Sequence, residues 1–257
     1  MTDHPPIAEL TPGICSVTLR SHGIQDVVRI AADAGLAGIE WGTDVHVSDA
    51  ASAAQAREAT EAAGLAVLSL GSYYRSGAFG DFERALELAA ALGAPRIRVW
   101  AGELGSSEAS PDHWESVVKD GQRIADLASD RRIALAFEYH GNTLTDSPAT
   151  TLELLDRIDH PNVGTYWQPA VGLSDQQALD SLHEVLPHVV GVHCFSWGPA
   201  GERFPLQLRA RLWQGVAEVL RNHGEDLDIM LEFVQDNLPE NVLSDAAFLH
   251  ALTLGED

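Results

Sequence analysis

Residues 133–140 have the sequence Ile-Ala-Leu-Ala-Phe-Glu-Tyr-His, which predicts a β-strand whose two faces differ. One alternating set is small or polar, namely Ala134, Ala136, Glu138 and His140, whereas the other is bulky and apolar. In a doubly wound open sheet both strand faces pack on helices, so both should be large and apolar. A closed barrel instead fills a narrow interior with layered side chains and covers its outer face with helices. This stretch therefore favours a barrel.

Two later segments repeat the same asymmetry. Residues 189–195 alternate between small or polar positions that include His193 and the apolar positions Val190 and Val192. In residues 228–234 the set that contains Glu232 faces away from a set of apolar residues. Each polar group lies near the C-terminal end of its strand, which is the end where (β/α)8 barrels carry their active sites.

The whole chain alternates between strand-like and helix-like runs for eight rounds. Glycine is favoured at the position just after a helix, and Gly35, Gly64, Gly93 and Gly224 stand where helices are expected to end. The predicted strands are 13–19, 38–41, 66–71, 96–100, 133–140, 163–167, 189–195 and 228–234. The predicted helices are 24–34, 51–63, 82–92, 111–129, 148–158, 175–186, 206–222 and 238–252. No Gly/Ser/Pro linker divides the chain, so we predict a single-domain (β/α)8 TIM barrel over residues 1–257.

The composition of the chain limits the kinds of partner that it is expected to bind. A net charge of −22 opposes binding to nucleic acid and to anionic membrane surfaces. Two cysteines cannot form a disulfide framework, and residues 1–6 lack the features of a signal peptide, so we expect a cytoplasmic protein. The expected partner is a small carbohydrate molecule, and a homo-oligomer remains open.

Polar residues of the interior phase mark the candidate active site. Three of them, Glu138, His193 and Glu232, belong to strands that meet at one mouth of the barrel. Two carboxylates and an imidazole suit a divalent transition metal better than Ca, and they leave positions open for substrate oxygens. Further candidates at strand ends are Glu40, Trp100, His140, Gln168 and Trp197.

Five short motifs resemble the sugar phosphate isomerase/epimerase family of xylose isomerase-like TIM barrels over nearly the whole chain. The motifs lie at residues 38–41 (Gly-Ile-Glu-Trp), 98–102 (Arg-Val-Trp-Ala-Gly), 137–142 (Phe-Glu-Tyr-His-Gly-Asn), 192–193 (Val-His) and 231–233 (Leu-Glu-Phe). This family includes ketose 3-epimerases and inosose dehydratases.

The resemblance implies a divalent metal held by Glu, Asp, His and Glu on strands five to eight. The corresponding positions here are Glu138, Gln168, His193 and Glu232, so a neutral amide stands where the family has a carboxylate. Val171 also stands where the epimerases have a His. We expect Mn as the metal, with Zn, Co and Mg as alternatives, and we expect Gln168 to weaken its binding.

The resemblance implies an isomerase or epimerase that acts through an enediolate, with Glu138 and Glu232 moving the protons. Two alternatives remain: an inosose dehydratase-like lyase, and a barrel that binds carbohydrate without converting it, which Gln168 favours. Expected substrate contacts are Glu40, Trp100, His140 and Trp197. Glu40 is equally explained as the buried ion-pair partner of Arg98, because both residues fall in the interior phase.

Overall fold

Eight parallel strands close into a barrel, as predicted. The computed structural model describes residues 8–255, and the expected domain limits at 1 and 257 lie outside this range. Around the barrel the strands follow the order β1-β10-β7-β6-β5-β4-β3-β2. The strands are β1 (Leu10–Cys15), β2 (Gly38–Gly42), β3 (Ala66–Arg75), β4 (Arg96–Trp100), β5 (Ala134–Glu138), β6 (Val163–Trp167), β7 (Val189–Cys194) and β10 (Leu227–Leu231).

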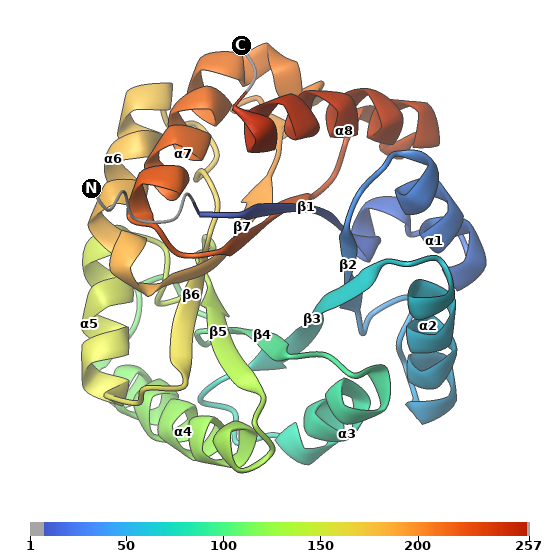
Figure 1. Cartoon of the computed structure of the whole chain (residues 1–257). Helices are drawn as coiled ribbons and strands as arrows, with labels where there is room; N and C mark the ends of the chain where they lie inside the picture. The colour runs from blue at the N-terminus through green and yellow to red at the C-terminus, as the bar shows by residue number, and fades with distance from the viewer. Residues whose placement is uncertain (1–7, 256–257) are drawn as a thin grey trace, which may run out of the picture.

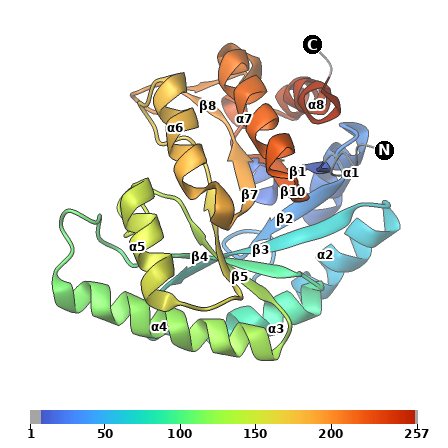
Figure 2. The same cartoon turned by 60° about the vertical axis from the view of Figure 1, so that its left-hand side comes forward.

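Helices form an outer ring around the strands (Figures 1 and 2). Within residues 8–255 the α-helices are α1 (Ile24–Asp33), α2 (Ala50–Ala62), α3 (Phe82–Leu92), α4 (Pro111–Asp130), α5 (Pro148–Ile158), α6 (Asp175–Val185), α7 (Ala210–His223) and α8 (Pro239–Leu254). Several begin at a side-chain cap: Asp49 precedes α2, and Ser110, Ser147 and Ser174 precede α4, α5 and α6. No helix in the described part of the chain is long and apolar enough to cross a membrane.

Two separate apolar clusters reproduce the two strand faces expected from the sequence. The larger one lies between the barrel and the helices and includes Leu135, Phe137 and Trp167. The smaller one fills the barrel interior and includes Ala136, Tyr166 and Met230. The interior also contains buried charged and hydrogen-bonding side chains, among them Glu40, Arg98 and His193.

The predicted limits of the first strand, residues 13–19, were wrong. The strand β1 begins at Leu10 and ends at Cys15, and the next residues, Ser16–Leu19, form a 3-10 helix. Pro12 interrupts the sequence pattern but not the barrel, because its carbonyl oxygen accepts a hydrogen bond of 2.8 Å from the Ala37 N–H. Proline lacks only the donor half of a peptide group.

The segment between β7 and α7 also differs from the prediction. The strands β8 (Ser196–Trp197) and β9 (Arg203–Phe204) pair as an antiparallel hairpin. A 3-10 helix, Leu206–Arg209, then precedes α7, where one helix was expected from 206. The sequence Gly198-Pro199-Ala200-Gly201 between the two short strands is a turn signal that points to this hairpin.

Asp245 of α8 anchors the chain after the hairpin. Its Oδ1 accepts a hydrogen bond of 2.9 Å from the Leu206 N–H, and the residue is 4% exposed. Burial raises the pKa of Asp245 to about 6. The folded state therefore binds this proton more tightly than the unfolded state does, and stability is lost as pH rises from the unfolded to the folded pKa.

We predict that Asp245→Asn stabilises the protein at pH 8, because it keeps the acceptor oxygen and removes the buried charge. A pKa shift of roughly 2 units corresponds to an upper limit of about 3 kcal/mol. The gain should shrink at pH 5, as measured by urea unfolding followed by circular dichroism. Equal unfolding free energies for the two proteins at both pH values would contradict this assignment.

Candidate active site

Four neighbouring strands bring the predicted metal ligands to one mouth of the barrel. Glu138 ends β5, Gln168 follows β6, His193 lies in β7, and Glu232 follows β10. These strands are adjacent in the order β5-β6-β7-β10. One donor atom from each of Glu138, His193 and Glu232 lies within 4.8 Å of the other two, so the expected convergence is present.

His193 Nδ1 is the centre of this group. It lies 3.2 Å from Gln168 Oε1 and 3.7 Å from Glu232 Oε2. Its distance from Glu138 Oε1 is 4.0 Å. The Gln168 amide donates from Nε2 to Glu138 Oε1 at 3.3 Å, which directs its oxygen toward the imidazole. Gln168 therefore faces the same space as the three charged or ionisable donors.

Arg98 of β4 lies beneath this group and joins two carboxylates. Its Nε donates to Glu40 Oε1 at 3.0 Å, and its Nη1 donates to Glu138 Oε2. The buried ion pair with Glu40 is thus the interpretation that the geometry supports. Glu40 is 2% exposed and does not line the cavity at the mouth, so it is not placed to contact a substrate there.

The two carboxylates that Arg98 joins are held in their charged form. Burial alone would raise the pKa of Glu138, but Arg98 and then His193 outweigh it and hold that pKa below its ordinary value. The pKa of Glu40 is likewise lowered, because Arg98 and His193 outweigh burial. Trp100 Nε1 adds a second donor to Glu138 Oε2. This oxygen is used within the protein, whereas Oε1 faces the mouth.

The charges in the barrel do not balance without a cation. Glu40, Glu138 and Glu232 are all buried, and Arg98 pairs with the first two of them. With His193 neutral, two negative charges remain. Burial and the charge of Glu138 raise the pKa of Glu232, although His193 and Arg98 oppose them. A divalent cation between Glu138, His193 and Glu232 would neutralise this excess, so the donor set fits such an ion.

A cavity of about 540 Å³ opens above these residues, a size typical of small-molecule sites. Its wall contains three of the expected substrate contacts, Trp100, His140 and Trp197. The Trp100 and His140 rings stack with centroids 5.1 Å apart. His140 Nδ1 lies 2.6 Å from the Gly141 carbonyl oxygen. A carbonyl only accepts, so Nδ1 carries the proton and Nε2 keeps its lone pair.

The hairpin adds a residue that the sequence did not single out. The Arg203 guanidinium lies over the ring of Phe233, 4.3 Å from its centroid, and 5.3 Å from the centroid of Trp197. Both rings line the cavity. Arg203 is half-buried, its Nη1 donates to Asn237 Oδ1 at 2.6 Å, and no carboxylate of residues 8–255 lies within 4.0 Å of it.

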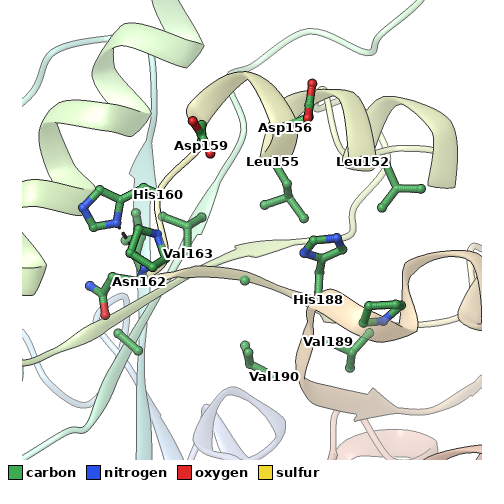
Figure 3. A pocket seen from close by; sticks show the side chains of 15 residues that line it. Leu152, Leu155, Asp156, Asp159, His160, Asn162, Val163, His188, Val189 and Val190 are labelled. Atoms are coloured by element: carbon green, nitrogen blue, oxygen red, sulfur yellow. Dashed lines mark hydrogen bonds between the residues drawn. The ribbon is translucent and has the colours of Figure 1, made fainter. Parts of the chain in front are cut away.

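A second hollow lies at the opposite end of the barrel, before β6 and β7. Its volume is about 780 Å³, and α5 covers one side with Leu152 and Leu155 (Figure 3). Two of its polar residues are used locally. His160 Nδ1 accepts from the Asn162 N–H at 3.1 Å, and the Asn162 amide donates to the Ile133 carbonyl at 2.8 Å. None of the residues that line it belongs to a three-donor group of the described chain.

Comparisons with known proteins agree with this fold. A family model described as xylose isomerase-like TIM barrel matches residues 28–252. A 3-dehydroshikimate dehydratase of Bacillus anthracis is 29% identical over 199 residues, which cover 70% of this chain and 69% of that protein.

Two solved structures share the fold. The probable 3-DHS dehydratase AsbF of Bacillus anthracis superposes with a TM-score of 0.78 and 21% identity, covering 94% of this chain and 99% of that one. A xylose isomerase-like TIM barrel protein from Mycobacterium smegmatis, in complex with magnesium, has a TM-score of 0.71 and 14% identity over 97% and 98% of the two chains.

We predict that Arg98→Ala destabilises the fold by about 3 to 5 kcal/mol, because it leaves two buried carboxylates without their shared partner. Urea unfolding measures the change. Arg57→Ala is the control, because Arg57 forms an exposed pair with Glu61 at 2.8 Å on α2 and should leave the midpoint unchanged. An unchanged midpoint for Arg98→Ala would show that Arg98 is solvated.

We predict that Gln168→Asp tightens the binding of Mn²⁺, because it adds a charge to a site whose attraction for a cation is mainly electrostatic. Metal-free protein titrated with Mn²⁺ in a calorimeter measures the change, and Glu138→Ala should abolish binding. If Gln168→Asp leaves the affinity unchanged while Glu138→Ala abolishes it, Gln168 is not a ligand.

Proposed function

Because this chain belongs to the xylose isomerase-like TIM barrel family, we propose that it is a metal-dependent lyase that removes water from a small, anionic, hydroxylated ring ketone such as 3-dehydroshikimate. The similarity to a 3-dehydroshikimate dehydratase supports this reaction class. The observation that supports an anionic substrate is that Arg203 is a half-buried cation without a carboxylate partner among residues 8–255.

The argument from Arg203 depends on its surroundings. The chain has a net charge of −22, so carboxylates are abundant, yet none pairs with this guanidinium in the described structure. Burial lowers its pKa, which marks a charge held partly out of water. Arg203 lies behind two rings of the cavity wall, Phe233 and Trp197. Arg20 lines the cavity itself, but Asp44 already neutralises it at 2.7 Å. A substrate carboxylate would give Arg203 the charge-assisted hydrogen bonds it lacks.

The metal would be held by Glu138 Oε1, His193 Nδ1 and Glu232 Oε2, with the Gln168 amide oxygen as a weaker fourth donor. The magnesium complex of the Mycobacterium smegmatis barrel supports a cation in this family. A bound divalent ion polarises a substrate carbonyl and acidifies the neighbouring C–H bond. The remaining chemistry belongs to the side chains that line the cavity.

His140 is the residue best placed to take the proton. Its Nε2 lone pair is available because Nδ1 donates to Gly141, whereas the oxygens of Glu138 are engaged by Arg98, Trp100 and Gln168. In the proposed step, Nε2 accepts the proton from the carbon next to the carbonyl. The electron pair of the C–H bond forms the C=C bond as the hydroxyl on the next carbon leaves.

The proton then passes from His140 to the departing hydroxyl, which releases one water molecule and restores the neutral imidazole. The stacking of His140 on Trp100 fixes the orientation of the ring during both transfers. The part expected for Glu138 and Glu232 in proton transfer stays a prediction.

The alternative is an isomerase or epimerase. Glu232 supports it, because its carboxylate receives no hydrogen bond from the described residues and so could return a proton to the opposite face of a substrate. The two reactions differ only in whether a hydroxyl leaves, and the substrate decides between them.

We predict that the protein with Mn²⁺ or Mg²⁺ converts 3-dehydroshikimate to its aromatic dehydration product, followed by ultraviolet absorbance. His140→Gln should lower kcat by about 100-fold or more. His183→Gln on the exposed face of α6 is the control. Exchange of deuterium from solvent into ketoses without dehydration would support the epimerase instead, and the absence of both reactions would support a binding protein.

We predict that Arg203→Gln raises the KM for 3-dehydroshikimate by about 10-fold or more, because a charge-assisted hydrogen bond is lost, with a smaller effect on kcat. Arg211→Gln, an exposed residue of α7, is the matched control. An unchanged KM for Arg203→Gln would remove the support for an anionic substrate.

A further inference from the structure

His193 presents both of its ring nitrogens to acceptors. Nδ1 faces Gln168 Oε1 at 3.2 Å and two carboxylates beyond it. Nε2 faces the other way, into the barrel, where Glu40 Oε1 lies 3.5 Å away. The ring is completely buried, so water cannot serve either nitrogen freely. A neutral imidazole has one proton and one lone pair, and these must be divided between the two sides.

The surroundings of Nε2 decide this division. No described group makes a hydrogen bond of normal geometry with Nε2, and the nearest acceptor is the Glu40 carboxylate. A lone pair directed at a buried carboxylate would be repelled, whereas an N–H would be attracted to it. Gln168 Oε1 is an acceptor as well, so without a cation Nδ1 also favours a proton. A cation beside Nδ1 would need the lone pair of that nitrogen, and the one proton of the neutral ring would then lie on Nε2, facing Glu40.

Glu40 is held firmly enough to impose this choice. Ser69 Oγ donates to its Oε2 at 2.6 Å, and Arg98 Nε donates to its Oε1 at 3.0 Å. Gly71 provides the space, because a Cβ there would lie 2.8 Å from Arg98 Nη2 and 2.9 Å from Glu40 Oε1. The carboxylate thus has a fixed position from which it faces His193.

We propose that Glu40 is a positioning residue that keeps the proton of His193 on Nε2 and so presents Nδ1 to the metal. The proposal rests on the metal site of the proposed function and adds a residue to it that does not touch the ion. Such a carboxylate behind a metal-binding histidine fixes the ring orientation and raises the basicity of the ligand nitrogen. Glu40 reaches the cavity only through His193.

The opposite arrangement, with a cation on the Nε2 side, is disfavoured. Cys15, Glu40 and His193 do form a second three-donor group within 4.8 Å. However, Arg98 already compensates the Glu40 charge there. Burial and the charge of Glu40 also raise the pKa of the Cys15 thiol, which keeps it protonated and a poor ligand. The Nδ1 side has the uncompensated charge.

The first test observes the proton directly in the wild-type protein. Metal-free protein labelled with ¹⁵N-histidine is examined by NMR correlations that distinguish protonated from unprotonated ring nitrogens, and the His193 signals are assigned by their loss in His193→Gln. We expect Nε2 to carry a proton both before and after Zn²⁺ is added, with Zn²⁺ shifting the Nδ1 signal. An unprotonated Nε2, or a metal shift at Nε2, overturns the proposal.

The second test measures affinity for Mn²⁺ alone by calorimetry. We expect Glu40→Gln to raise the Kd about 10- to 100-fold, the usual effect of losing a carboxylate behind a ligand. Asp228→Asn is the control, because it neutralises a carboxylate of the same barrel that pairs with Arg96 and not with Arg98. It should change the Kd by less than about 3-fold.

An equal Kd for Glu40→Gln and wild type, or no Mn²⁺ binding by the wild type, overturns the proposal. If Glu40→Gln does not fold, the NMR result on the wild type decides alone. These readouts are independent of turnover. A protein that shows the expected NMR and Mn²⁺ results but leaves 3-dehydroshikimate unchanged would retain the role of Glu40 and lose the proposed reaction.

Discussion

The contact of the Arg98 guanidinium with two buried carboxylates is the interaction on which the rest of the site depends. Arg98 reaches Glu40 on one side and Glu138 on the other, and all three side chains are nearly inaccessible to water. Desolvating three charges is costly, and mutual attraction repays the cost only when the geometry is good and the remaining hydrogen-bonding capacity is used. Ser69 and Trp100 supply that remaining part by donating to the two carboxylates.

The same network orients the Glu138 oxygen that faces the candidate metal site. Because Arg98 and Trp100 engage Oε2 of Glu138, its Oε1 is turned toward Gln168 and His193. Glu232 then approaches the imidazole without a positive partner of its own among the described side chains within 4.0 Å other than His193. A single guanidinium can therefore anchor two acids and still leave an attractive field for a divalent ion. Because Gln168 is neutral, that field is weaker than it would be with a carboxylate at this position.

The wall of the cavity comes from a different part of the chain. The aromatic wall comes partly from strand ends, as with Trp100, and partly from the β8–β9 hairpin and the residue after Glu232. Phe233 has a positive φ of 60°, which is unfavourable for an aromatic residue, and its ring lies under the guanidinium of Arg203. The hairpin thus places a cation beside the cavity of a strongly acidic protein, where a small anion would otherwise be repelled.

The sequence by itself determined the architecture and the residues that point into the barrel. Alternation of small or polar with bulky residues has a period of two, so it reports which face of a strand meets the narrow interior without knowledge of the neighbouring strands. Glu138, His193 and Glu232 could be grouped for that reason, and so could the interior pair Glu40 and Arg98. Pro12 obscured the start of β1, because a proline in the sequence does not reveal that its carbonyl still accepts a hydrogen bond from Ala37, just before β2.

Only the tertiary structure decided how these interior groups divide their partners. Arg98 could pair with either glutamate from its phase alone, and the closed barrel places it between both. The two faces of His193 and the unpaired charge of Arg203 likewise depend on distances between segments far apart in the chain. Periodicity specifies a direction within one strand, whereas a hydrogen bond requires two groups to meet within about 3 Å, and only the packed barrel sets that distance.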